Sequence, residues 1–232
     1  MTIKTQSTTF AAIFAASILG MAATANAQSA ADKAKTSFFI TSVGGGDGAN
    51  FGGLEGADAH CSALAEKAGL SKTWAAYLSA SMVIDRSSGS PKVTNGISAR
   101  DRIGSGPWYN SKGVMIAKDV EDLHTNANIN LETGLDENGD PINGRGTRPN
   151  KHDILTGTDS SGHFSTAGGD TTCGNWTKNG EGSAIVGHHD RVGLNQSRNM
   201  VSWNSSHGSA GCGAEDLPRT GGAGLLYCFA TD

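Results

Sequence analysis

The sequence predicts a single α+β domain that is held together by two disulfides and carries long irregular loops. Glycine accounts for 33 of the 232 residues and only 17% are charged, so much of the backbone must lie in turns and loops between few helices. The hydrophobic fraction of 37% is that of a folded protein rather than of a disordered chain. Four cysteines complete the pattern, because cross-links stabilise a domain that has few large apolar side chains.

The N-terminal segment, residues 1–27, has the features of a cleaved signal peptide. One cation, Lys4, precedes an uncharged apolar run over 10–23, and Ala25-Asn26-Ala27 is the small-x-small pattern of a signal-peptidase site. The apolar run is short for a membrane span. We therefore expect cleavage after Ala27 and a secreted or periplasmic protein that does not insert into the membrane. Its cysteines would then lie in an oxidising space.

The mature chain has 17 basic and 22 acidic residues once Lys4 is removed, a formal charge of −5. This charge gives no general attraction to nucleic acid, so we expect no nucleic-acid partner. We expect a flexible polar lead-in over 28–36, followed by one domain over 37–232 and a monomeric protein.

The first half of the domain contains the clearest elements. Residues 37–43 are β-branched and aromatic and predict a strand, and 74–79 predict a second one. Between them, residues 54–68 place their apolar side chains, including Cys61, on one helical face, and Gly69 is suited to end that helix. A loop rich in serine and glycine then continues to Gly96.

Later elements are shorter. Extended pieces are predicted around Tyr109 and over 114–117, a short helix over 119–124, and a buried final strand over 225–230. Between helix and final strand, residues 126–169 are polar and glycine-rich with little periodicity. A loop of this length inside one domain either carries function or contains short strands that the pattern does not resolve.

The four cysteines permit three pairings, and their spacing alone does not choose among them. The nested pairing, Cys61 with Cys228 and Cys173 with Cys212, fits the predicted elements best. It ties the first helix to the final strand and closes the irregular segment between Cys173 and Cys212.

The ordered segments GGLEGADAHC, GLSKTWAAYLSAS, ARDRI, IAKDVEDL, TTCGNWT, SAGC and GLLYCFA resemble the endostatin domain, the C-terminal domain of collagens XV and XVIII. That domain is a compact variant of the C-type lectin-like fold, and the resemblance implies the same fold and the same nested disulfides here. The likeness fails over 126–169, which we interpret as an insertion.

The ligand sites of these families do not carry over. Endostatin domains bind heparan sulfate through clustered arginines and zinc through N-terminal histidines. Here the arginines are scattered and the first mature histidine, His60, lies inside the predicted helix. The calcium ligands of sugar-binding lectins would correspond to Trp203-Asn204-Ser205 and to Arg148-Pro149-Asn150, and neither triplet has the required carboxylate.

Two segments hold the candidate functional residues. The stretch 126–169 supplies His152 and Asp153, and the stretch 173–212 supplies the others. From the latter we select His189, Asp190, Trp203, Asn204 and His207 as ligand-binding residues. His188 and His189 are adjacent, so on a regular strand they point to opposite faces and cannot both reach one ion.

We expect an exported, non-enzymatic binding module that recognises a glycan, another polar extracellular ligand or a protein through these two segments, without a required cofactor. Loops on a rigid scaffold are the usual place for such recognition. The alternative is a secreted metal-dependent hydrolase in which His152, Asp153, His188, His189 and Asp190 hold the metal ion. No serine lies in a G-x-S-x-G elbow, and all four cysteines are assigned to disulfides, so nucleophilic catalysis is not predicted.

Overall fold

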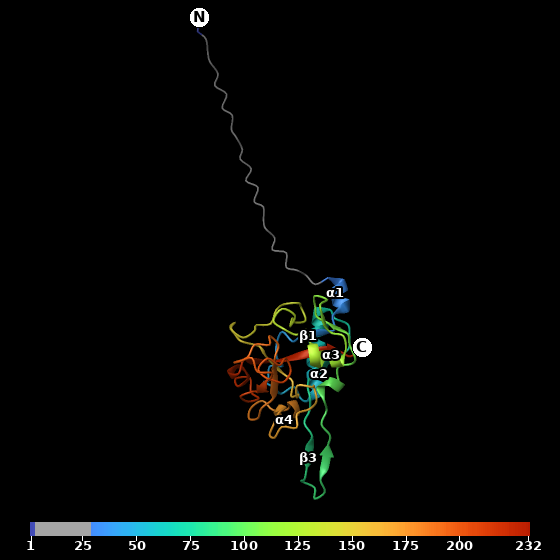
Figure 1. The fold of residues 1–232 in the computed structure, drawn as a ribbon. Coiled ribbons are helices and arrows are strands. Elements are labelled where there is room, and N and C mark those ends of the chain that lie inside the picture. Colours follow the sequence, from blue (N-terminus) through green and yellow to red (C-terminus); the bar gives the residue numbers. More distant parts are fainter. Residues whose placement is uncertain (3–28) are drawn as a thin grey trace.

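The structure, a computed structural model, describes residues 1–2 and 29–232; the predicted cleavage site after Ala27 lies outside them. Within these residues the chain is a mixed α/β protein built around one six-stranded sheet (Figure 1). The strands of that sheet are β1 (Phe38–Ile40), β2 (Trp74–Ala76), β7 (Asp153–Leu155), β8 (Ile185–His188), β9 (His207–Gly208) and β10 (Gly222–Ala230).

Strand β10 organises the sheet. It pairs with β1 on one side and with β2 and β7 on successive parts of the other, and β8 and β9 continue the sheet beyond β7. All pairs are antiparallel except β10 with β7, which is parallel. The strand order is therefore β1-β10-β7-β8-β9, and the three strands at its far end carry the residues discussed below.

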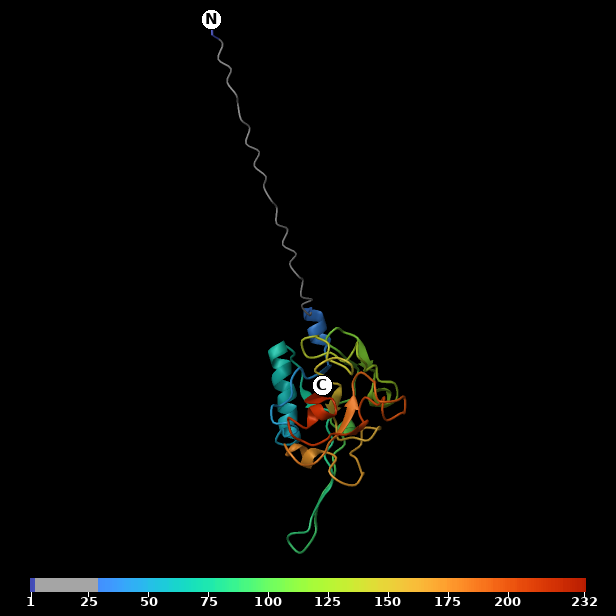
Figure 2. The same cartoon turned by 90° about the vertical axis from the view of Figure 1, so that its left-hand side faces the viewer.

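Both faces of β10 are buried, as its continuous apolar sequence predicts. Leu226, Cys228 and Ala230 belong to one core cluster, and the alternate residues Leu225, Tyr227 and Phe229 belong to a second cluster. The first cluster lies between the sheet and α2 (Leu54–Ala68), which runs along one side of the domain (Figure 2). The predicted helix 54–68 is confirmed, and Gly69 ends it in the left-handed conformation at φ 75°.

The remaining helices are short. They are α1 (Ala30–Lys35), α3 (Val120–Asn126) and α4 (Cys173–Trp176), with single 3-10 turns at Ala99–Asp101 and Leu217–Arg219. Helix α1 lies in the stretch predicted as a flexible lead-in, and it packs against the domain. Nζ of Lys33 donates a hydrogen bond to the carbonyl of Ala68 at 2.7 Å, and Nζ of Lys35 lies 3.9 Å from the ring centroid of Tyr109.

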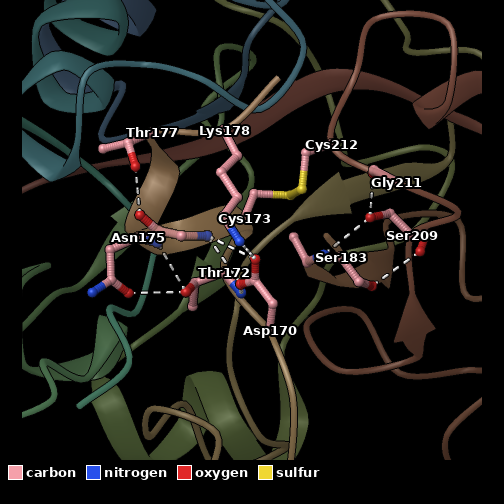
Figure 3. The surroundings of a disulfide bond; sticks show 12 residues. Asp170, Thr172, Cys173, Asn175, Thr177, Lys178, Ser183, Ser209, Gly211 and Cys212 are labelled. Carbon is pink, nitrogen blue, oxygen red and sulfur yellow. Dashed lines mark hydrogen bonds and ion pairs between the residues drawn. A yellow bond between two sulfur atoms is a disulfide. The ribbon is translucent and has the colours of Figure 1, made fainter. Parts of the chain in front are cut away.

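Both predicted disulfides are confirmed, Cys61–Cys228 between α2 and β10 and Cys173–Cys212 between α4 and the segment after β9. Figure 3 shows the second one with the hydrogen bonds around it. Beside it, the carboxylate of Asp170 accepts from Nζ of Lys178 at 2.8 Å and from the backbone N–H of Gly174. The disulfide and this ion pair therefore hold the same turn.

Two other small sheets complete the fold. β5 (Trp108–Tyr109) pairs with β6 (Met115–Ala117), close to the extended pieces predicted there. β3 (Val83–Asp85) and β4 (Lys92–Thr94) form an exposed hairpin that projects from the domain in both views (Figures 1 and 2). The sequence predicts a loop here, and that prediction is wrong.

The polar segment 126–169 is not wholly loop, because it supplies β7, a buried strand that joins β10 to β8. No helix among the described residues is long and apolar enough to cross a membrane. The nested disulfides and the mixture of helices and strands agree with the prediction of a domain with both helices and strands and two nested disulfides.

Candidate metal centre

Strands β7, β8 and β9 bring histidine and aspartate side chains to one face of the sheet. Asp153 lies directly opposite His188, and His207 lies opposite Val186. Directly opposed residues share a face, and so do residues two apart along a strand. Asp153, His188 and His207 must therefore point the same way, and His152, just before β7, reaches the same place.

Three imidazole nitrogens converge on one carboxylate oxygen. Nε2 of His152, His188 and His207 lie 3.1, 3.3 and 3.7 Å from Oδ1 of Asp153. Nε2 of His188 is also 3.0 Å from Nε2 of His207. Ligand atoms of a tetrahedral zinc ion bound at about 2.0–2.1 Å are separated by about 3.3 Å. These four separations, 3.0–3.7 Å, scatter around this value, and His152, Asp153 and His188 form the group whose ligand atoms all lie within 4.8 Å of one another.

The opposite nitrogen of each ring has its own acceptor. Nδ1 of His152 lies 3.2 Å from Oδ1 of Asp190, Nδ1 of His188 is 2.7 Å from the carbonyl of Met200, and Nδ1 of His207 is 3.0 Å from the carbonyl of Gly208. If each Nδ1 carries the proton, each Nε2 presents its lone pair to the common point. This arrangement is characteristic of metal-binding histidines, whose second nitrogen is usually held by an oxygen.

A glycine allows the acceptor of His188 to come close. A Cβ on Gly187 would collide with the carbonyl of Trp203, so the segment before β9 can cross β8 at this distance only because residue 187 has no side chain. The backbone N–H of His188 donates to the carbonyl of Ser202 at 2.9 Å, beside the Met200 contact. The segment at 200–202 thus holds His188 through both its backbone N–H and its ring Nδ1.

Asp153 is buried without a hydrogen bond. Its side chain is inaccessible to solvent, and both carboxylate oxygens lack a partner of good hydrogen-bond geometry. A buried carboxylate is costly unless it is paired or binds a metal ion. The nearby nitrogens give Asp153 charge contacts only, which leaves its oxygens available to a cation.

Electrostatics at the site favour positive charge. Burial acts to lower the pKa of His188, but the nearby carboxylate of Asp153 and the carbonyl of Met200 outweigh it and raise that pKa. Burial acts to raise the pKa of Asp190, but hydrogen bonds from His152 and from the backbone of Arg145 and Val192 lower it to about 2. Asp190 is therefore ionised behind His152.

His189 lies apart from this cluster, as strand alternation predicts. Its Nε2 is 3.4 Å from the carbonyl of Asn143, and its Nδ1 has no hydrogen-bond partner. Burial lowers the pKa of this ring to about 4, so it is neutral at physiological pH.

Trp203 and Asn204 occupy a different place. Trp203 is 4% exposed and packs against the rings of Tyr77 and Tyr227. The amide of Asn204 donates to the hydroxyl of Tyr77 at 3.1 Å. Both residues line a pocket of about 300 Å³ that does not include His152, His188 or His207.

A pocket of about 410 Å³ opens onto the cluster. It is lined by His152, His188, His207, Arg145, Arg219, Leu194, Met200 and Thr220. His207 is the most exposed of the four converging side chains at 27%, against 2% or less for the others. A ligand in this pocket would therefore approach an ion bound by these side chains from the side of His207.

Of the predicted ligand-binding residues, the structure brings His152, Asp153 and His207 together and places Asp190 behind His152. It also adds His188, which the sequence analysis names as a metal ligand only in the hydrolase alternative. The sequence does not predict the backbone carbonyls of Met200 and Gly208 as acceptors for these rings, because every residue has a carbonyl.

In comparisons with known proteins, no family model matches the chain, and no curated protein matches it. A function must therefore be inferred from the site itself.

Proposed function

We propose that this chain is an exported, non-enzymatic binding module that holds one zinc ion through His152, Asp153, His188 and His207. The observation that supports it most is the convergence of three imidazole Nε2 atoms on the buried, unbonded Oδ1 of Asp153. Burial of this carboxylate is costly, and an ion at this point would offset that cost by binding the oxygens of Asp153.

The donor set favours zinc over hard cations. Calcium and magnesium take oxygen ligands, whereas imidazole nitrogen with one carboxylate suits zinc and its neighbours in the first transition series. The separations of Oδ1 of Asp153 from Nε2 of His152 and of His188, 3.1 and 3.3 Å, match tetrahedral coordination, which is the usual geometry of zinc in proteins.

The lining of the pocket favours binding over hydrolysis. A zinc hydrolase needs a general base that takes a proton from the attacking water. Among the described residues that line the pocket, no carboxylate is available as a general base. We therefore place the hydrolase second.

The same site links the two segments expected to carry recognition. His152 and Asp153 come from 126–169, and His188 and His207 come from 173–212. One ion would fix both segments, so that a glycan, another polar extracellular ligand or a protein would meet a rigid surface.

We further propose the C-type lectin-like, endostatin-like fold and export to the periplasm or the extracellular space. The tie between the first long helix and the last strand supports the fold, and two disulfides are compatible with an oxidising compartment. The zinc site differs from that of the endostatin domain, since it uses none of the N-terminal residues.

The test is metal analysis of the oxidised mature protein after equilibration with a series of buffered free zinc concentrations. We expect one zinc ion per chain, and at least about 100-fold weaker binding in Asp153→Asn and in His207→Ala, each of which removes one ligand. His163→Ala is the matched control, because His163 is exposed, lies near Ser98 and does not line the pocket. Equal zinc affinity in all four proteins would refute the proposal.

A further inference from the structure

The pocket over the proposed zinc ion has a cationic rim. Arg145 and Arg219 line it together with the three histidine rings, and its lining contains no acidic residue among those that the structure describes. Arg219 is 68% exposed and lies 3.3 Å from Asp216. The guanidinium of Arg145 has no hydrogen-bond or ion-pair partner among the described residues; only its backbone N–H is used, by Asp190.

The charges near the pocket add up in favour of an anion. A zinc ion with neutral histidines and one aspartate carries a net charge of +1, and the two arginines add two more positive charges. Asp190, which faces His152 from behind and accepts the backbone N–H groups of Arg145 and Val192, and Asp216, which pairs with Arg219, subtract two. The sum is +1, and Arg145 is the cation of the rim without a carboxylate partner among the described residues.

The pocket also has an apolar wall. It is formed by Leu194, which is 78% exposed, and by the half-buried Met200. An exposed leucine beside two cationic side chains and a metal site suits a ligand that has an anionic head and an apolar body.

We infer that the pocket binds a small organic carboxylate, whose oxygen coordinates the zinc ion as a fifth ligand while Arg145 and Arg219 hold the same carboxylate and Leu194 and Met200 contact its alkyl part. The inference rests on the proposed zinc site. Zinc with four ligands can expand to five, and guanidinium groups match a carboxylate with two parallel hydrogen bonds. Binding forms one coordinate bond and breaks none.

The test uses the full mature protein loaded with Co²⁺ in place of zinc. Four-coordinate Co²⁺ absorbs visible light strongly and five-coordinate Co²⁺ weakly, so a coordinating anion lowers the absorbance. Butyrate, acetate, inorganic phosphate and butyramide are titrated separately. We expect butyrate to lower the absorbance at the lowest concentration, acetate to require more, and neutral butyramide to have no effect.

A double variant separates the rim from the metal site. In Arg145→Gln/Arg219→Gln we expect butyrate to bind at least about tenfold more weakly, while Co²⁺ affinity stays the same, because neither arginine contacts a metal ligand through its side chain. An unchanged butyrate affinity in this variant would overturn the inference, as would tighter binding of phosphate than of butyrate.

The outcomes also distinguish this inference from the proposed function. If the four-coordinate Co²⁺ spectrum forms but no anion alters it, the carboxylate site is refuted and the metal site stands. If no such spectrum forms in the folded protein, both are refuted.

Discussion

Asp190 acts on the proposed zinc ion through His152. Its Oδ1 lies 3.2 Å from Nδ1 of that ring, and its two oxygens also accept the backbone N–H groups of Val192 and Arg145. The carboxylate thus holds the imidazole in one orientation and joins it to the loop at 144–145. Carboxylates in this position keep a ligating ring aligned and raise its basicity.

We predict that Asp190→Asn weakens zinc binding by about 10–100-fold, because an amide offers one acceptor oxygen where the carboxylate offers two. The measurement is competition with a chromogenic chelator, together with the melting temperature of the metal-free protein. Asp101→Asn, at an exposed aspartate, is the control. A folded Asp190→Asn protein with the zinc affinity of the parent would show that Asp190 does not position His152.

At the scale of residues, the sequence predicts part of this site. Alternation along a strand separates His188 from His189, and the structure agrees. The same rule would separate His152 from Asp153, yet Nε2 of His152 lies 3.1 Å from Asp153. His152 precedes β7 and is free of the strand geometry. Whether His152 follows the alternation depends on where β7 begins, and a single sequence does not predict a strand boundary to within one residue.

At the scale of elements, the long helix and the strands β1 and β2 were predictable, whereas β7 and the β3–β4 hairpin were not. The apolar face of α2 repeats over four turns, which is a strong local signal. Strand β7 has three residues in a polar context, and its stability comes from pairing with β10 and β8, far away in sequence. The β3–β4 hairpin is exposed on both strands, so no apolar alternation marks it.

The turn at α4 gives a prediction about pH. Burial acts to raise the pKa of Asp170, but hydrogen bonds from Lys178 and from the backbone of Gly174 and Thr172 outweigh it and lower the pKa below its ordinary value of 3.8. A lowered folded pKa means that the unfolded chain binds the proton more readily. The stability contributed by this carboxylate is therefore full above pH 3.8 and is lost as the pH falls through the lower folded pKa.

We expect Asp170→Asn to be less stable than the parent at pH 6 and the difference to shrink steadily below pH 3.8. Urea unfolding of both proteins at a series of pH values measures it. Asp101→Asn, whose carboxylate is exposed, should show no such convergence. A constant difference between the parent and Asp170→Asn down to the acid limit would mean that the ionised form contributes nothing to the turn.

At the scale of the whole molecule, two disulfides and the proposed zinc ion would each stabilise a different part of the domain. Cys61–Cys228 joins α2 to β10, and Cys173–Cys212 joins α4 to the segment after β9. The proposed zinc ion would join β7, β8 and β9, which neither disulfide connects directly. The two disulfides were predictable, because the nested pairing fits the predicted first helix and final strand. The third link depends on strand register, which arises from long-range pairing.

This arrangement predicts the effect of zinc on the oxidised protein. An ion that binds only the folded state stabilises it by about 2.7 kcal/mol at a free concentration 100 times its dissociation constant. For a domain of this size that corresponds to a rise of about 5–10 °C in melting temperature. We expect the rise in the parent protein with both disulfides intact, and no rise in Asp153→Asn, when thermal unfolding is followed at fixed free zinc. Hydrogen exchange should slow most in β8 and β9, where local opening requires the ion to leave. An equal rise in both proteins would place the stabilising zinc ion elsewhere on the chain.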